Sequence, residues 1–326
     1  MAPSLFRSPV QLLPAEALEL SKQAPGILRS SPSTSSSAIS ALFSAPEKPE
    51  LWISYENLIL SSLRTGDDKA ASQCLARLVA RFGEDNERVM ALRGLVKEAE
   101  AQNNGELEKI LKEYDQILSE NDTNIPIMKR RIGLLRSMGR LSDAATALVQ
   151  LLDFSPTDAE AWSELSDLYF TQGLYAQAIY AAEEVLVLVP NAWNVHARLG
   201  ELQYMAATAS GANGASYQKQ MAEALKRFSR SIELCDDYLR GYYGLKLVTG
   251  RILKDSVKAT KLTDEGDFVL PDVKTIERLN QLATAKLAEI VRHSTAQDRG
   301  WRGYNPAEVA AARELLSEDS SSGVVR

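Results

Sequence analysis

The chain has 326 residues, of which 45% are apolar, 25% charged and 7% aromatic, and 43 acidic against 37 basic side chains give a net charge of −6. This composition is typical of a soluble globular protein and disfavours non-specific binding to nucleic acid or anionic lipid. With only two cysteines and two histidines, a disulfide framework and a cysteine-rich zinc site are excluded.

Residues 1–45 are predicted as an N-terminal segment, with a short helix at about 14–23 and the Ser/Pro-rich linker SSPSTSSS at 30–37. The segment contains no apolar run long enough for the core of a signal peptide. Elsewhere the most apolar stretch, at 185–189, is far shorter than the roughly 20 residues of a spanning helix. We therefore expect the protein to stay in the cytosol and to be held at a membrane only by its partners.

A repeat with a period of 34 residues runs through the region 46–255. The markers that recur at this interval are Gly105, Gly139 and Gly173, Pro156 and Pro190, and Ala144 and Ala178. Between them, apolar residues recur every three or four positions, as in an amphipathic helix. Each repeat is therefore predicted as two helices that are joined at a glycine turn and ended by proline. The region holds about five repeats, with a flexible Gly/Ala/Ser loop inserted near 207–218.

One repeat, AEAWSELSDLYFTQGLYAQAIYAAEEVLVLVPNA at 159–192, resembles the tetratricopeptide repeat (TPR). The positions that match the family pattern are Trp162, Leu165, Tyr169, Gly173, Tyr175, Ala178 and Pro190. The resemblance implies an all-α fold, a right-handed superhelix (α-solenoid) of stacked helix pairs. Two helical segments in 256–316 are predicted to form a C-terminal cap, and 317–326 is predicted to be a disordered tail.

In the TPR family the first helix of each repeat lines a concave groove, and this resemblance assigns ten residues to a protein-binding surface. They are Lys129, Arg130 and Arg136, then Glu160, Glu164, Asp167 and Phe170, then Arg198, Glu201 and Tyr204. The groove is expected to be basic, then acidic, then mixed in charge, with Phe170 and Tyr204 as apolar anchors. Such a surface suits an extended or helical segment of another protein, whereas the alternative is a solvated face without a ligand.

Other candidate sites have simpler interpretations. Packing positions of the repeats account for Trp162, Tyr169, Tyr175 and His196. The chain contains no GxSxG, HExxH or Walker A motif, and no GxGxxG after a strand, so no catalytic, cofactor-binding or metal site is predicted. The carboxylate clamp of TPR co-chaperones is not expected either, because Glu164 would place a negative charge against the bound carboxylate.

A wider resemblance rests on LWISYENLILSSLRTGDDKAASQCLARL, YDQILSENDTNIPIMKRRIGLLRSMGRLSDAATALVQLL and KLAEIVRHSTAQDRGWRGYNPAEVAAARELL. From about Leu51 to Leu316 the chain resembles the family of subunit 2 of the ER membrane protein complex, in a fungal version. The resemblance implies a non-enzymatic scaffold, peripheral on the cytosolic side of the endoplasmic reticulum membrane. Its complex inserts transmembrane proteins, including tail-anchored ones.

The partners implied by this resemblance are the cytosolic portions of membrane subunits and a second soluble subunit, with no nucleic acid, no direct membrane span and no small-molecule substrate. The main alternative is a free cytosolic TPR adaptor that binds peptide segments of chaperone or trafficking partners. An enzyme is the third hypothesis, since folds do not determine function and sites do.

Overall fold

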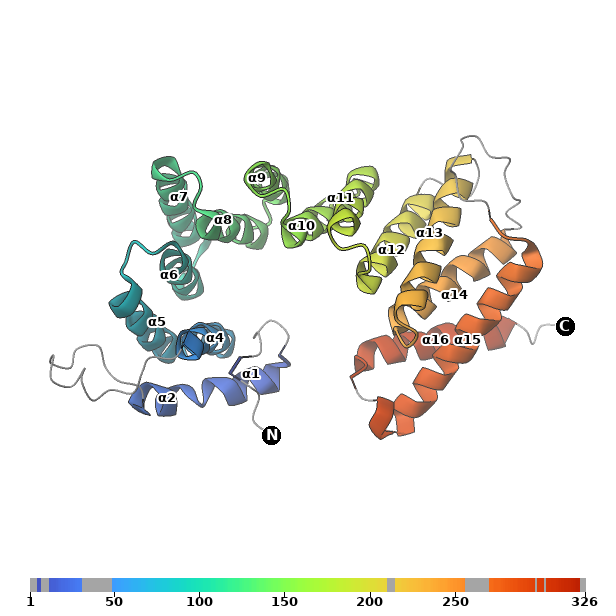
Figure 1. The fold of residues 1–326 in the computed structure, drawn as a ribbon, viewed down its shortest axis with the longest axis horizontal. Helices are drawn as coiled ribbons and strands as arrows, with labels where there is room; N and C mark the ends of the chain where they lie inside the picture. The colour runs from blue at the N-terminus through green and yellow to red at the C-terminus, as the bar shows by residue number, and fades with distance from the viewer. Residues whose placement is uncertain are drawn as a thin grey trace. The chain divides into compact units, whose positions relative to one another are not determined.

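The computed structural model describes residues 5–6, 12–30, 49–209, 215–255, 270–296, 298–301 and 303–322. Within these residues every element is an α-helix or a short 3-10 helix, and none of the helices is both long and apolar enough to cross a membrane. The chain divides into two compact units, Met1–Phe154 and Ser155–Arg326, which we call the N-terminal unit and the C-terminal unit. In each, successive helices pack side by side (Figure 1), which confirms the predicted all-α fold of TPR type.

From α4 to α9, short turns join the helices of the N-terminal unit, and successive helices pack on one another. The helices are α1 (Pro14–Ser21), α2 (Ala24–Ser30), α4 (Pro49–Thr65), α5 (Asp68–Phe82), α6 (Glu87–Glu100), α7 (Asn104–Glu120), α8 (Ile125–Ser137) and α9 (Leu141–Phe154). Helix α1 packs on α4, and Leu20 is buried in one core with Tyr55 and Leu58. The described part of the N-terminal segment thus packs in this unit's core as far as Leu28.

Glycine ends the first helix of three repeats in the left-handed conformation. The residues and their φ angles are Gly66 (75°), Gly139 (75°) and Gly173 (73°). The turn predicted at Gly105 is wrong, because this residue lies in the first turn of α7. Asn103 begins that helix instead, and its side chain accepts a hydrogen bond from the Glu106 backbone N–H at 3.1 Å. A side-chain cap therefore replaces the glycine at this turn.

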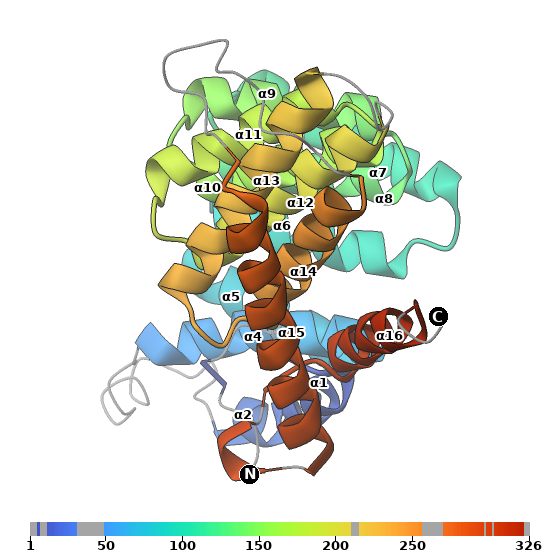
Figure 2. The ribbon, with the colours of Figure 1, turned by 90° about the vertical axis from the view of Figure 1, so that its right-hand side faces the viewer.

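The C-terminal unit begins with the repeat that matches the TPR pattern best and ends with two longer helices. Its elements are α10 (Ala159–Thr171), α11 (Tyr175–Leu188), α12 (Trp193–Ala209), α13 (Ala215–Leu234), α14 (Leu239–Lys254), α15 (Val273–Ala296), η2 (Arg299–Trp301) and α16 (Pro306–Ser322). Figure 2 shows α15 as the long orange-red helix that faces the viewer and α16 as the red helix that follows it. Helix α15 packs on α14, and α16 packs on α15.

Close approach of α12, α13 and α14 depends on two glycines around the ring of Phe228. A Cβ on Gly200 would lie 3.0 Å from this ring, and a Cβ on Gly244 would lie 2.0 Å from it. Both glycines are buried, so the ring fills the space between the two helices that carry them. The small residues of the repeat pattern thus leave the space that one aromatic side chain occupies.

Helices extend into both the loop predicted at 207–218 and the disordered tail predicted at 317–326. Helix α12 continues to Ala209 and α13 begins at Ala215, because Ala207 and Tyr217 are buried in the core of the C-terminal unit. Helix α16 continues to Ser322, since a helix that has formed extends at small cost per residue. The rest of these two segments, and of the linker at 30–37, lies outside the described residues.

Candidate protein-binding surface

A side chain at the fourth position of three first helices fixes the turn before its own helix. Trp162 Nε1 donates to the carbonyl oxygen of Pro156 (2.9 Å), His196 Nε2 to that of Pro190 (3.0 Å) and Tyr242 Oη to that of Asp236 (3.0 Å). Burial lowers the pKa of His196, which is 6% exposed, although the hydrogen bond to the Pro190 carbonyl acts in the opposite direction. The packing interpretation of Trp162 and His196 is confirmed.

In the N-terminal unit, Arg130 is bound to the carboxylate of Glu98 rather than presented freely on the surface. Its Nε donates to Glu98 Oε1 at 3.2 Å and its Nη2 to Glu98 Oε2, and the two side chains are 27% and 12% exposed. Tyr114 Oη donates to the same carboxylate at 2.5 Å. Burial and the charge of Glu98 raise the pKa of Tyr114, so its hydroxyl stays a donor. These three residues, the Glu98 cluster, join α6, α7 and α8.

The Glu98 cluster exists because α6 carries a glycine where Tyr114 approaches. A Cβ on Gly94 would lie 2.1 Å from Tyr114 Oη, well inside the distance that two such atoms tolerate. The remaining basic residues expected on α8, Lys129 and Arg136, are both exposed. The basic part of the expected surface therefore consists of one arginine held within the fold and two cationic side chains at the protein surface.

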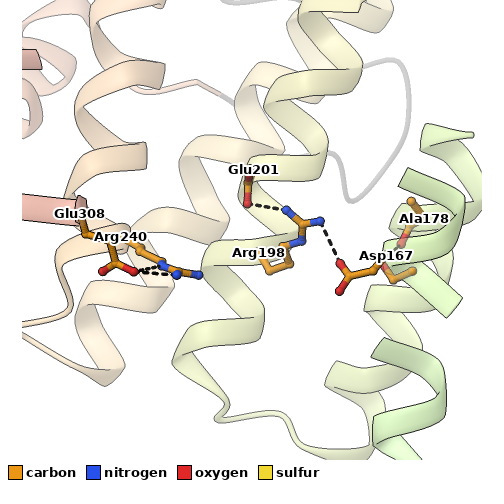
Figure 3. A network of polar contacts seen from close by, with 7 residues as sticks. Asp167, Ala178, Arg198, Glu201, Arg240 and Glu308 are labelled. Atoms are coloured by element: carbon orange, nitrogen blue, oxygen red, sulfur yellow. Dashed lines mark hydrogen bonds and ion pairs between the residues drawn. The ribbon is translucent and has the colours of Figure 1, made fainter. Parts of the chain in front are cut away.

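In the C-terminal unit, Arg198 occupies the centre of a second charged group, the Arg198 cluster (Figure 3). Its Nη1 donates to Glu201 at 2.7 Å and its Nη2 to Asp167 at 2.9 Å, so it joins α12 to α10. The guanidinium carbon also lies 4.6 Å from the centre of the Phe170 ring, a cation–π contact. Burial lowers the pKa of Arg198, but the hydrogen bond and charge of Glu201 together with Asp167 outweigh it and raise the pKa.

The other residues expected on the C-terminal unit differ in exposure. Glu160 is exposed and Glu164 is half-buried, both on α10. Tyr204 is half-buried and packs against the core that α12 shares with α13 and α14. Phe170, the second expected anchor, packs against a core of α11 and α12 and contacts the ring of Tyr175 at 6.0 Å. The two aromatic anchors thus offer only part of their surface to a partner.

Two further polar contacts of the C-terminal unit join neighbouring helices. Ser166 stands where TPR proteins usually have glycine or alanine, and its buried Oγ donates to the Ala178 carbonyl of α11 at 2.7 Å. Arg240 donates to Glu308 Oε1 from Nη2 at 2.6 Å and from Nε at 3.0 Å, which joins α14 to α16. The serine therefore replaces a close helix contact with a hydrogen bond.

Sequence reasoning missed Glu98 and Tyr114, although the charges follow a regular spacing. An acidic residue on one first helix pairs with an arginine about one repeat later on the next first helix. The pairs are Glu56 with Arg88, Glu98 with Arg130 (both 32 residues apart) and Asp167 with Arg198 (31 residues apart). A search for opposite charges at this spacing would have found Glu98. Tyr114 has no such signal, because its position depends on Gly94.

Comparison with known proteins assigns the family. Residues 85–217 match the family described as EMC2 TPR-like repeat domain. TPR repeat protein oca3 of Schizosaccharomyces pombe is 31% identical over 261 residues, which cover 76% of this chain and 88% of the relative. ER membrane protein complex subunit 2-A of Xenopus laevis is 28% identical over 72% of this chain and 74% of its own length. The chain belongs to the ER membrane protein complex subunit 2 family.

The subunit 2 family extends to Saccharomyces cerevisiae, whose ER membrane protein complex subunit 2 is 27% identical over 67% of this chain and 70% of its own length. Residues 85–217, which match the family's repeat domain, begin just before α6 and end in the first turn of α13. All ten expected contact residues and the Glu98 cluster lie inside this range. The family resemblance stated from the sequence is thereby confirmed.

Proposed function

We propose that this protein is a non-enzymatic scaffold subunit on the cytosolic face of the ER membrane protein complex. In this role it organises membrane subunits for the insertion of transmembrane proteins, including tail-anchored ones. The observation that carries the proposal is the match of residues 85–217 to the EMC2 TPR-like repeat domain. Relatives that are named as subunit 2 of this complex support it over up to 72% of the chain.

The proposed partners are cytosolic portions of membrane subunits and a second soluble subunit, which bind the exposed faces of first helices. On α8 the contact residues are Lys129 and Arg136, with Arg130 behind them in the Glu98 cluster. On α10 and α12 the Arg198 cluster, with Glu160, Glu164 and Tyr204 beside it on the same two helices, provides a mixed surface. Because hydrogen bonds already hold Arg198 and Asp167, these side chains are ordered before a partner arrives.

The first test is affinity purification of the tagged protein from detergent-solubilised cells, followed by mass spectrometry. Stoichiometric recovery of several multi-spanning proteins of the endoplasmic reticulum is the expected result. Recovery of soluble chaperones alone would contradict the proposal and favour a free cytosolic TPR adaptor. A second mass-spectrometric analysis, after limited washing has removed loosely bound proteins, identifies which proteins bind this chain directly.

Charge reversal then tests the α8 face. The double variant Lys129→Glu, Arg136→Glu should lose membrane subunits while keeping its helix content, because both residues are exposed. Arg130 is left unchanged, since its loss would disrupt the Glu98 cluster. The matched control is Lys109→Glu, Lys112→Glu on α7, which reverses two exposed cations in the same unit. Equal recovery with both double variants would place the interface elsewhere.

A further inference from the structure

His196 is a buried, titratable ring at a position where two other repeats carry side chains that do not titrate near neutral pH. It is 6% exposed, and its Nε2 donates to the Pro190 carbonyl at 3.0 Å. The equivalent bonds come from the indole N–H of Trp162 and the phenol O–H of Tyr242. Of these three donors, only the imidazole gains a proton between about pH 5 and pH 8. The turn before α12 is therefore fixed by a group whose charge depends on pH.

The second ring nitrogen of His196 is the atom that takes up an added proton. A carbonyl oxygen only accepts, so Nε2 keeps its hydrogen and the proton must go to Nδ1. Among the residues that the structure describes, Nδ1 is buried and has no hydrogen-bond partner. The new N–H would be a buried donor without a protein acceptor, which costs free energy that the neutral ring avoids. Protonation thus disfavours the folded position of the ring.

The charged groups that act on this ring are both cationic. They are Arg227 and Arg230 of α13, and both lower the pKa of His196. Arg227 Nη2 donates to Glu183 of α11 at 3.5 Å, and Arg230 Nη1 donates to Glu233 of α13 at 3.1 Å. The two carboxylates bind the arginines, which weakens their effect on the imidazole but does not reverse it. A protonated ring would add a third positive charge beside them.

Other charged groups on α12 and on the helices that pack against it are bound to other partners. The pairs are Arg198 of α12 with Asp167 and Glu201, Glu223 with Lys226 on α13, and on α14 Arg240 with Glu308, Lys246 with Asn280 and Arg251 with Asp255. Glu184, the second carboxylate of α11, is half-buried and is not among the groups that shift the pKa of His196. Burial lowers this pKa most, the bond to the Pro190 carbonyl raises it, and the two arginines of α13 lower it further, so the result is a lowered pKa.

The turn that His196 fixes leads directly into α12. The helix begins at Trp193, whose carbonyl accepts a hydrogen bond from the buried Ser231 Oγ of α13 at 2.8 Å. This bond and the bond of His196 both act on the start of α12. Arg198, which joins α12 to α10, lies two residues after His196 on the same helix. Release of the ring therefore affects the first turns of the helix that carries the Arg198 cluster.

We propose that His196 is an acid-sensitive contact, which holds the turn between α11 and α12 while its ring is neutral and releases the turn when the ring is protonated. Protonation at Nδ1 places a buried positive charge beside Arg227 and Arg230, so the charged ring moves toward water. The bond to the Pro190 carbonyl is then lost, and the first turns of α12 loosen from α13. The inference goes beyond the scaffold function and does not depend on it, because it concerns the fold of the C-terminal unit alone.

The pH range follows from the direction of the shift. The folded state holds this proton less tightly than the unfolded chain does. The stabilisation by the neutral ring is therefore complete above pH 6.5, the ordinary pKa of histidine, and it is lost as pH falls through the lowered pKa.

The titration of the ring is measured by NMR on the full-length protein with isotope-labelled histidine. The chain has two histidines, so two sets of ring signals are expected, and His293→Gln assigns them. We expect the His196 signal to titrate with a midpoint below 6.5. A midpoint at or above this value would overturn the proposal. The measurement needs no change at His196 itself, so it decides the question even where a variant of this residue does not fold.

The effect on stability is tested with His196→Tyr, which keeps a donor of the kind that Tyr242 supplies but does not titrate in this range. Thermal unfolding is followed between about pH 8 and pH 5. We expect the midpoint temperature of the unchanged protein to fall further over this range than that of the variant. The matched control is His293→Gln, which removes the other histidine. An equal fall in the unchanged protein and in His196→Tyr, or removal of the extra fall by His293→Gln instead, contradicts the proposal.

Hydrogen exchange with mass spectrometry locates the loosening. The unchanged protein and His196→Tyr are compared at the same pH, so that the intrinsic dependence of exchange on pH cancels. At about pH 8 both should exchange equally, and at about pH 5 the unchanged protein should exchange faster in peptides that cover the α11–α12 turn and the first turns of α12. Equal exchange there at the lower pH, or faster exchange spread evenly over the whole C-terminal unit, would rule out a local release at this turn.

Discussion

The Glu98 cluster of the N-terminal unit and the Arg198 cluster of the C-terminal unit use the same charges in opposite ways. In the first, a carboxylate is central and 12% exposed, and it accepts from an arginine and a buried tyrosine. In the second, an arginine is central and 32% exposed, with Asp167 at 47% and Glu201 at 52%. Both clusters join neighbouring first helices at nearly the same spacing along the chain.

The difference in exposure separates a structural role from a surface role. Water screens the ion pairs of Arg198, so they add little stability, but they fix the position of charge on a face of α10 and α12. The Glu98 cluster is screened less, and its tyrosine hydroxyl has no room to turn toward solvent, since Tyr114 is 2% exposed. We therefore expect the N-terminal unit to depend on its cluster for stability far more than the C-terminal unit does.

The largest expected effect comes from Gly94→Ala, which removes the room for Tyr114. The new Cβ would lie 2.1 Å from Tyr114 Oη, so the ring must move and its bond to Glu98 is lost. We expect a destabilisation of about 3 kcal/mol, even after the roughly 1 kcal/mol that alanine gains over glycine in a helix. Urea unfolding followed by circular dichroism measures it.

Gly133→Ala is the matched control for this substitution. Gly133 also lies inside a helix next to the cluster, but a Cβ there would meet Arg130 Nη1 at an ordinary 3.7 Å. The control should be neutral or more stable by up to about 1 kcal/mol. If both alanine variants shift the unfolding midpoint equally, the N-terminal unit does not depend on the Glu98 cluster for its stability.

A pair of matched amide substitutions compares the two clusters directly. Glu98→Gln leaves an acceptor for Tyr114 but takes the opposite charge from Arg130, so we expect a loss of about 2 kcal/mol. Asp167→Asn takes the same charge from the better-exposed Arg198, and we expect a loss below about 1 kcal/mol. At high salt the loss for Asp167→Asn should shrink more than the loss for Glu98→Gln, because buried pairs are screened less, so the difference between the two variants should widen slightly. Similar losses for the two variants would refute the distinction drawn between the clusters.

The repeat pattern was sufficient to predict the fold, because most repeats carry a residue type at the turn that shows where their two helices are joined. Gly139 and Gly173 recur at one interval and both adopt positive φ, as a residue at such a turn must. Gly105 recurs at the same interval yet lies inside α7, since Asn103 caps that helix. Periodicity thus predicted that a helix hairpin exists there, but not which residue makes its turn.

The candidate surface was harder to predict, because exposure depends on contacts between distant residues. The family pattern assigned Arg130 and Arg198 to equivalent positions of two repeats. Only the structure shows that Gly94 admits Tyr114 and so draws the first arginine into the fold. Composition also misled at Tyr217, which lies in a Gly/Ala/Ser-rich stretch but is 2% exposed in the core. Local sequence does not record which distant side chain will cover a position.

The smallest expected effect is a loss of stability at alkaline pH that depends on one tyrosine hydroxyl in each unit. Burial and the charge of Asp237 raise the pKa of Tyr304 from 10.0 to about 12, and its hydroxyl donates to the Asp237 carbonyl at 2.9 Å. Because the folded state holds this proton more tightly, the stabilisation is complete below pH 10 and is lost as pH rises through about 12. Tyr304→Phe should remove this part of the alkaline loss of stability in unfolding measurements between those values. Tyr114→Phe extends the test to the N-terminal unit: the pKa of Tyr114 is raised further, so its stabilisation also begins to be lost above pH 10, and this variant too should flatten the profile in this range. A profile that keeps its slope in Tyr304→Phe would contradict the role given to this hydroxyl.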